Sequence, residues 1–128
     1  KATTAPLTTK AASFTDMDRD RAAGATFVAR TTSYHAQEIT RLLKKGIQHK
    51  GFSVVEILSP CPTHFGRRNK LGTASDMLEH LKDRTTPVGS KAKQDDPSLI
   101  ERGVFVEQPD VPEYCSAYER TVELAHKG

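Results

Sequence analysis

The chain has 128 residues, which is enough for one small domain. Hydrophobic residues make up 36% of it and charged residues 27%, and tryptophan is absent, so we expect a globular domain with a mainly aliphatic core. The net charge of +3 is too small to indicate a nucleic-acid partner. No apolar run approaches membrane-spanning length, so we expect no membrane partner either.

The chain has two cysteines and five histidines. Because no secretory signal accompanies the cysteines, we expect a reducing compartment, the cytoplasm. No Cys-x-x-Cys or His-x-x-x-His pair occurs, so the sequence shows no complete metal site.

The first part of the chain is polar and charged. Residues 1–13 are rich in Thr, Ala and Lys without a period, which predicts a mobile arm. Thr15 and Asp18 have the spacing of a capping box, so a charged helix is expected to run from there to Ala23 and end at Gly24.

A strand–helix–strand pattern follows. We expect strands over 25–30 and 52–58 and a helix over 34–49, which together predict a βαβ unit with parallel strands. The second strand does not alternate, so both of its faces are expected to be covered. Glu56 within it is expected at the sheet's end or paired with a cation, with a buried catalytic carboxylate as the less favoured alternative. Apolar residues at helical spacing predict the core face of the helix: Ala36, Ile39, Leu43 and Ile47.

The second half of the chain predicts further elements. A capping box of Thr73 and Asp76 starts a helix over 74–84, and the Pro- and Gly-containing stretch 85–98 is expected to be a linker-like excursion. A strand is expected over 103–107, followed by a last helix capped by Asp110. The stripe on that helix is expected to face the core: Cys115, Tyr118, Val122 and Ala125.

The strand over 52–58 leads into the most site-like stretch of the chain. Cys61 stands between two prolines, which restrict the backbone on both sides of it. It lies where a parallel strand ends, which is where α/β proteins place ligands. The cationic run 66–70 follows without an acid. A buried structural cysteine and a solvated loop are the alternative interpretation.

Five segments of the sequence resemble one known family: KATTAPLTTKA (1–11), GATFVAR (24–30), HKGFSVVEILSPCPTHFGRRNK (49–70), GVFVE (103–107) and PEYCSAYE (112–119). They are similar to the beta subunit of 2-oxoacid:ferredoxin oxidoreductases, with the 2-oxoglutarate type as the nearest match. The resemblance covers nearly the whole chain, which looks like the C-terminal half of such a subunit. The Ser59–Thr63 run with Gly66–Asn69 is its most specific part.

The resemblance implies an α/β fold, a partial thiamine diphosphate-binding fold with a βαβ unit and a parallel sheet, in which residues 1–128 form a single domain. In the full enzyme it implies thiamine diphosphate, magnesium and a 4Fe-4S cluster as cofactors. It also implies partners: an alpha subunit and other subunits, ferredoxin, a 2-oxo acid and coenzyme A. The reaction it implies is oxidative decarboxylation of the 2-oxo acid to an acyl-CoA.

One residue takes a role from the resemblance. Cys61 matches the last cluster cysteine of the family, and Arg67 and Arg68 follow it in the same motif. These arginines either contact an anionic group or partner subunit, or are solvated surface charge. The other three cluster cysteines and the Gly-Asp-Gly motif for magnesium and diphosphate are absent, and Cys115 matches no family role.

The sequence also departs from the family, because residues 14–23 are highly charged where the resemblance implies an apolar helix. For the isolated chain we expect no catalytic residues, no bound cofactor, no activity, and self-association through uncovered apolar surface. A second hypothesis stays open, namely a stand-alone, non-catalytic α/β module that binds an acidic partner or phosphate.

Overall fold

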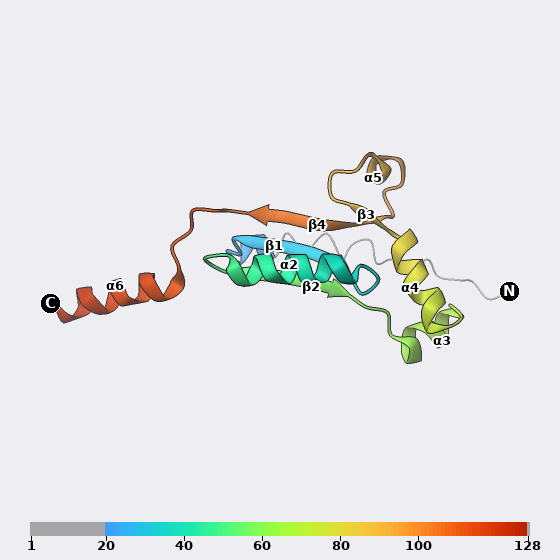
Figure 1. The fold of residues 1–128 in the computed structure, drawn as a ribbon, viewed down its shortest axis with the longest axis horizontal. Helices are drawn as coiled ribbons and strands as arrows, with labels where there is room; N and C mark the ends of the chain where they lie inside the picture. Colours follow the sequence, from blue (N-terminus) through green and yellow to red (C-terminus); the bar gives the residue numbers. More distant parts are fainter. Residues whose placement is uncertain (1–19, 128) are drawn as a thin grey trace.

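The computed structural model describes residues 20–127 and shows an α/β fold built on a four-stranded sheet in the order β2-β1-β4-β3 (Figure 1). The predicted arm 1–13 and the capping box at Thr15 lie outside the described residues. The strands are β1 (Phe27–Thr32), β2 (Ser53–Leu58), β3 (Thr85–Pro87) and β4 (Ile100–Glu107). The helices are α2 (Ala36–Gln48), α3 (Arg67–Asn69), α4 (Ala74–Asp83), α5 (Lys91–Asp95) and α6 (Tyr114–His126), and a π-turn spans Pro62–Gly66.

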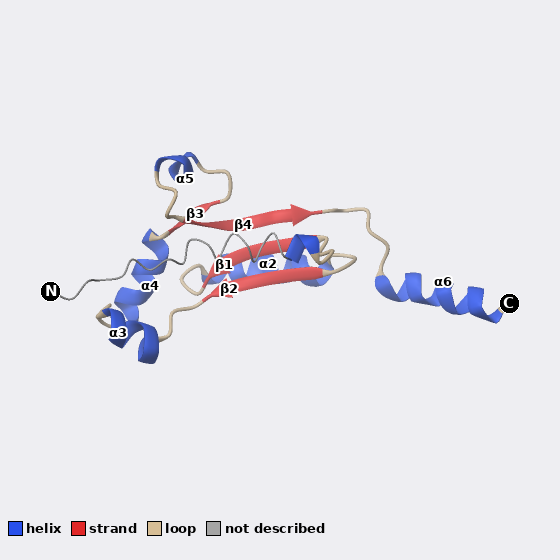
Figure 2. Ribbon diagram, turned by 180° about the vertical axis from the view of Figure 1, so that it is seen from behind, coloured by secondary structure: helices blue, strands red, loops and turns tan. Residues whose placement is uncertain are grey.

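The predicted βαβ unit is confirmed. β1 and β2 pair in parallel along their whole length, from Phe27 opposite Ser53 to Thr32 opposite Leu58. α2 lies against one face of these strands, and Figure 2 shows the sheet from its other face. Gly51 makes the joint between α2 and β2 possible, because its φ is +109° and a Cβ there would lie 2.5 Å from the Thr26 hydroxyl oxygen.

The core lies on both sides of β1, all six of whose residues are buried. Phe27 and Ala29 pack with Leu42 of α2, and Val28 packs with Ala25 on the opposite side. The expectation that both faces of β2 are covered holds in part, because Val54 and Val55 pack against these two clusters on opposite faces, but no residue of β2 is fully buried. β2 is at the edge of the described sheet, and its Ile57 is 38% exposed.

The sheet is mixed rather than wholly parallel. β4 runs antiparallel to β1, with Phe27 opposite Glu107 and Arg30 opposite Gly103, whereas β3 is parallel to β4. The reason is the route of the chain after β2. The chain stays at the carboxyl ends of β1 and β2 through the π-turn and α4, so that β4 starts at that end and runs back along β1 (Figure 1).

The core face of α2 differs from the predicted one by about one residue. Leu42 is fully buried, while Leu43 is 40% and Ile47 84% exposed. The close approach at Gly46 explains the difference, because a Cβ at Gly46 would lie only 3.2 Å from a methyl group of Val55. The helix therefore turns its glycine side, rather than its Ile47 side, towards the sheet.

Two predictions for the second half of the chain are corrected. The stretch 85–98 is not a plain linker, because it carries β3 and α5. The last helix is capped by Glu113, whose carboxylate accepts a hydrogen bond from the Ser116 N–H at 3.1 Å, and not by Asp110. None of the described residues of α6 is buried and Cys115 is exposed, because α6 extends away from the sheet (Figure 1).

Several local predictions hold. Glu56 pairs with the buried Arg30 of the neighbouring strand. Thr73 and Asp76 form the reciprocal capping box at the start of α4. Gly24 has a φ of +90° at the end of a short helical stretch. Among the helices of residues 20–127, none has the length and apolar character needed to cross a membrane.

We predict that Leu42→Ala lowers the free energy of unfolding by about 2–5 kcal/mol, because it removes a fully buried side chain between α2 and β1. Ile47→Ala, on the exposed side of the same helix, is expected to change it by less than about 0.5 kcal/mol. Urea denaturation of both variants measures the difference. Equal losses, or a larger loss for Ile47→Ala, would contradict the observed orientation of α2.

Candidate functional site

Cys61 is exposed just beyond the carboxyl end of β2. Since β1 and β2 are parallel, their carboxyl ends lie next to each other at the same end of the strands. The Ser33 N–H donates to the Leu58 carbonyl oxygen at 2.8 Å, which ties the end of β1 to the segment that leads to Cys61. The predicted position at the exit of a parallel strand is therefore confirmed.

The backbone around Cys61 is held by the π-turn. The Cys61 carbonyl oxygen accepts hydrogen bonds from the N–H groups of Phe65 and Gly66, both at 3.0 Å. Pro62 occupies the first position of the turn, where its fixed φ suits a helical start and its missing N–H costs no hydrogen bond. The thiol is thus carried by a short segment with little backbone freedom.

The environment of the sulfur favours the thiolate. The backbone N–H groups of His64 and Phe65, and to a smaller extent that of Thr63, lower the pKa of the Cys61 thiol, and burial opposes them. A thiolate is the form of cysteine that attacks electrophiles and binds metal. An exposed side chain with this charge preference is a suitable ligand for an iron atom.

Cys115, the other cysteine, has the opposite environment. It is exposed on the first turn of α6 beside the capping carboxylate of Glu113. Its hydrogen bond to Glu113, and then the negative charge of that carboxylate, raise the pKa of the Cys115 thiol. The two exposed cysteines therefore differ in their readiness to ionise.

Contacts of Gly66, Met77 and Asn69 hold the π-turn after Cys61 in place. Gly66 is buried against Met77 of α4, and a Cβ there would lie 2.7 Å from the Met77 sulfur. The Asn69 side-chain amide donates to the Phe65 carbonyl oxygen at 2.8 Å. In the sequence, Gly66 and Asn69 stand out only as parts of a motif, and no pattern links Met77 to Cys61. The spacing of the capping box, which fixes α4, was the available signal.

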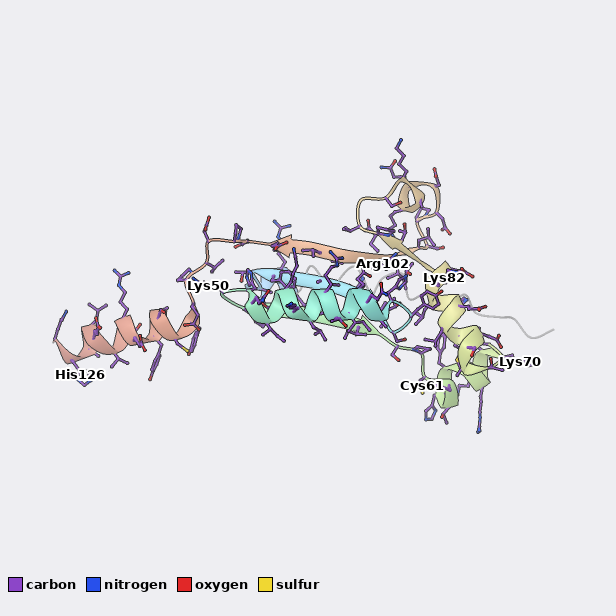
Figure 3. The ribbon with its side chains drawn as sticks, in the orientation of Figure 1. Lys50, Cys61, Lys70, Lys82, Arg102 and His126 are labelled. Atoms are coloured by element: carbon purple, nitrogen blue, oxygen red, sulfur yellow. The ribbon has the colours of Figure 1, made fainter. Side chains whose placement is uncertain are left out.

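The arginines of the motif are at the surface. Arg67 and Arg68 are exposed on α3, and Lys70, also exposed, follows them. The π-turn, α3 and α4 form one lobe of the molecule, and Figure 3 shows Cys61 and Lys70 in this lobe, beyond the end of α2. The structure thus brings Cys61, Arg67 and Arg68 together in one lobe, as the sequence predicted.

Curated proteins with similar sequences are known. The chain is 35% identical over 125 residues to the 2-oxoglutarate synthase subunit KorB of Methanothermobacter marburgensis, covering 94% of this chain and 43% of the relative. It is also 35% identical to the subunit of that name from Methanocaldococcus jannaschii, covering 96% of this chain and 46% of the relative. A 43-residue stretch, 34% of this chain and 14% of the relative, is 49% identical to the 2-oxoacid:ferredoxin oxidoreductase 2 beta subunit of Aeropyrum pernix.

The chain belongs to the family of 2-oxoacid:ferredoxin oxidoreductase beta subunits. It spans less than half the length of the first two relatives. No protein-family model matches the chain.

The family resemblance implies a 4Fe-4S cluster, and the observed thiol of Cys61 fits one of its ligand positions. The side chain is exposed, its pKa is lowered by backbone N–H groups, and its backbone is held by the turn. Within residues 20–127 no group of three or more His, Cys, Asp or Glu side chains could hold a metal ion. The described residues therefore contain no complete metal site, and Cys61 could supply at most one of the ligands.

A second polar cluster holds the start of α2 against the carboxyl end of β1. The Glu38 carboxylate accepts hydrogen bonds from the Thr31 hydroxyl and the Arg102 guanidinium, both at 2.8 Å. Burial raises the pKa of Glu38, but these two donors outweigh it and leave the pKa lowered. The sequence does not reveal this cluster, because Glu38 and Arg102 are 64 positions apart and only the fold joins them.

In the iron-free chain we predict that Cys61 is alkylated faster than Cys115 at pH 7–8, because its lowered pKa leaves a larger fraction of thiolate. Both thiols are exposed, so access does not separate them and each is the control for the other. Peptide mapping after timed exposure to iodoacetamide, repeated across pH, measures both rates. Equal rates, or a faster Cys115, would contradict the assigned environment of Cys61.

Proposed function

We propose that this chain is part of the beta subunit of a 2-oxoacid:ferredoxin oxidoreductase, and that Cys61 supplies one thiolate ligand of its 4Fe-4S cluster. The observation that supports this role is the exposed Cys61 thiol, which a braced turn holds at the carboxyl edge of the sheet with N–H groups beside its sulfur. Family membership supports the enzyme over the stand-alone binding module that the sequence left open.

The proposed reaction consumes a 2-oxo acid and coenzyme A and releases carbon dioxide and an acyl-CoA, with two electrons passing to ferredoxin. Thiamine diphosphate with magnesium supplies the electron sink for decarboxylation, and the cluster carries the electrons onward one at a time. The part of this chain is to hold the Cys61 sulfur as a thiolate at a fixed place. The N–H groups of residues 63–65 lower the pKa of its thiol, and Met77 and Asn69 contact the turn that carries it.

We propose 2-oxoglutarate as the 2-oxo acid, since the printed names of the first relatives are 2-oxoglutarate synthase subunits. The other proposed partners are an alpha subunit and the remaining subunits of the complex. Thiamine diphosphate, magnesium and the other three cluster ligands are proposed to be held outside this stretch of sequence. The cytoplasm is the proposed location.

In the assembled oxidoreductase we predict that Cys61→Ala removes the EPR signal of the reduced cluster nearest to the site of decarboxylation and lowers the iron content by one cluster per beta subunit. A cluster that loses one of its thiolates is expected to be lost or severely weakened. EPR of the dithionite-reduced complex and iron analysis are the measurements.

Cys115→Ala is the matched control, because it removes the other exposed thiol of the chain. It is expected to keep both the signal and the iron. An unchanged EPR signal in Cys61→Ala, with the subunits still assembled, would contradict the proposed role.

A further inference from the structure

An exposed cationic surface adjoins the Cys61 turn. It consists of Arg67, Arg68 and Lys70, which we call the α3 patch. Within residues 20–127 none of the three has an acidic side chain within ion-pair distance. Some cations elsewhere in the described fold are paired, as Lys45 is with Glu107 at 3.0 Å and Arg102 with Glu38 at 2.8 Å. Others, such as Lys44 and Lys50, are exposed and form no ion pair with a described residue. The α3 patch thus presents uncompensated positive charge to the outside.

Within the described residues, the acids of the neighbouring helix α4 form no ion pair with this patch. α4 carries Asp76, Glu79 and Asp83, whereas no acid occurs between Ser59 and Ser75. Asp76 accepts hydrogen bonds from the N–H and the hydroxyl of Thr73, so its carboxylate is used in capping α4. The three cations of the patch therefore lie in the acid-free segment that follows Cys61, whereas the acids of this lobe lie on α4.

The patch is fixed relative to the sulfur of Cys61. Gly66 connects the turn to α3 and donates to the Cys61 carbonyl oxygen, while Asn69 of α3 donates to the carbonyl oxygen of Phe65. Lys82 of α4 lies 5.6 Å from the centre of the Tyr34 ring, which joins the lobe to the loop after β1. A molecule bound to the α3 patch would therefore sit at a defined place beside Cys61.

We infer that the α3 patch is the docking surface for the electron acceptor, an acidic carrier protein; this rests on the proposed function. Oxidation of one 2-oxo acid to an acyl-CoA releases two electrons, and a one-electron carrier removes one at each encounter. Two reduced carriers must therefore leave in each cycle, which calls for a brief contact. Unpaired surface charge speeds such encounters without holding the product, and its effect weakens as salt screens it.

The test is the double charge reversal Arg67→Glu/Arg68→Glu in the assembled oxidoreductase. With a ferredoxin of net negative charge we expect kcat/KM at low ionic strength to fall about tenfold or more, and the dependence on salt to flatten or invert. Turnover with a zwitterionic viologen of zero net charge, such as a bis(sulfonatopropyl) viologen, reports substrate oxidation without carrier docking and is expected to keep its wild-type rate. Iron content and subunit assembly are measured on the same preparation.

Lys44→Glu/Lys50→Glu is the matched control, since both lysines are exposed and Figure 3 places Lys50 at the opposite end of α2 from Cys61. It is expected to leave the salt dependence near the wild-type one. If both double variants lowered kcat/KM with ferredoxin equally, the inference would be overturned. Equal losses of turnover with ferredoxin and with viologen in Arg67→Glu/Arg68→Glu, or loss of a subunit from that variant, would overturn it as well. An intact iron content with such a result would leave the role of Cys61 standing, because the Cys61→Ala experiment tests that role separately.

Discussion

The pairing of β1 with β2 sets the position of everything that follows in the chain. Their register is parallel and unbroken over six residue pairs, so both strands end at the same edge of the sheet. The bond from the Ser33 N–H to the Leu58 carbonyl oxygen extends this pairing beyond the strands. Cys61 follows three residues after Leu58. A shift of this register by one residue would turn the side chains of Ser53–Leu58 to the opposite faces of the sheet. It would also move Cys61 along the sheet by one residue.

Two independent features make Cys61 more than an exposed thiol. The π-turn restricts where its backbone can be, and the N–H groups of the same turn favour its ionised form. A cluster ligand needs both properties, since the sulfur must be charged and must meet the iron at a fixed place. Cys115 shows that exposure alone does not favour ionisation, because Glu113 beside it raises the pKa of its thiol.

The features that the sequence predicted correctly are mostly local. The βαβ order, the capping box of Thr73 and Asp76 and the place of Cys61 each depend on short spacings that the chain shows directly. What it could not show depends on distant pairing. The direction of β4 follows from its contact with β1, and α6 has an apolar stripe but no core to cover it. Leu42 and Leu43 are adjacent, so periodicity alone could not decide which of them faces the sheet.

The most direct test is the location of the iron in the assembled oxidoreductase. Anomalous diffraction at the iron edge, or a cryo-EM map that resolves the cluster, gives the distance from each iron to the Cys61 sulfur. The account predicts an iron atom within bonding distance of that sulfur, with the π-turn unchanged around it. A cluster held by four other side chains, with the Cys61 sulfur turned to solvent, would contradict it.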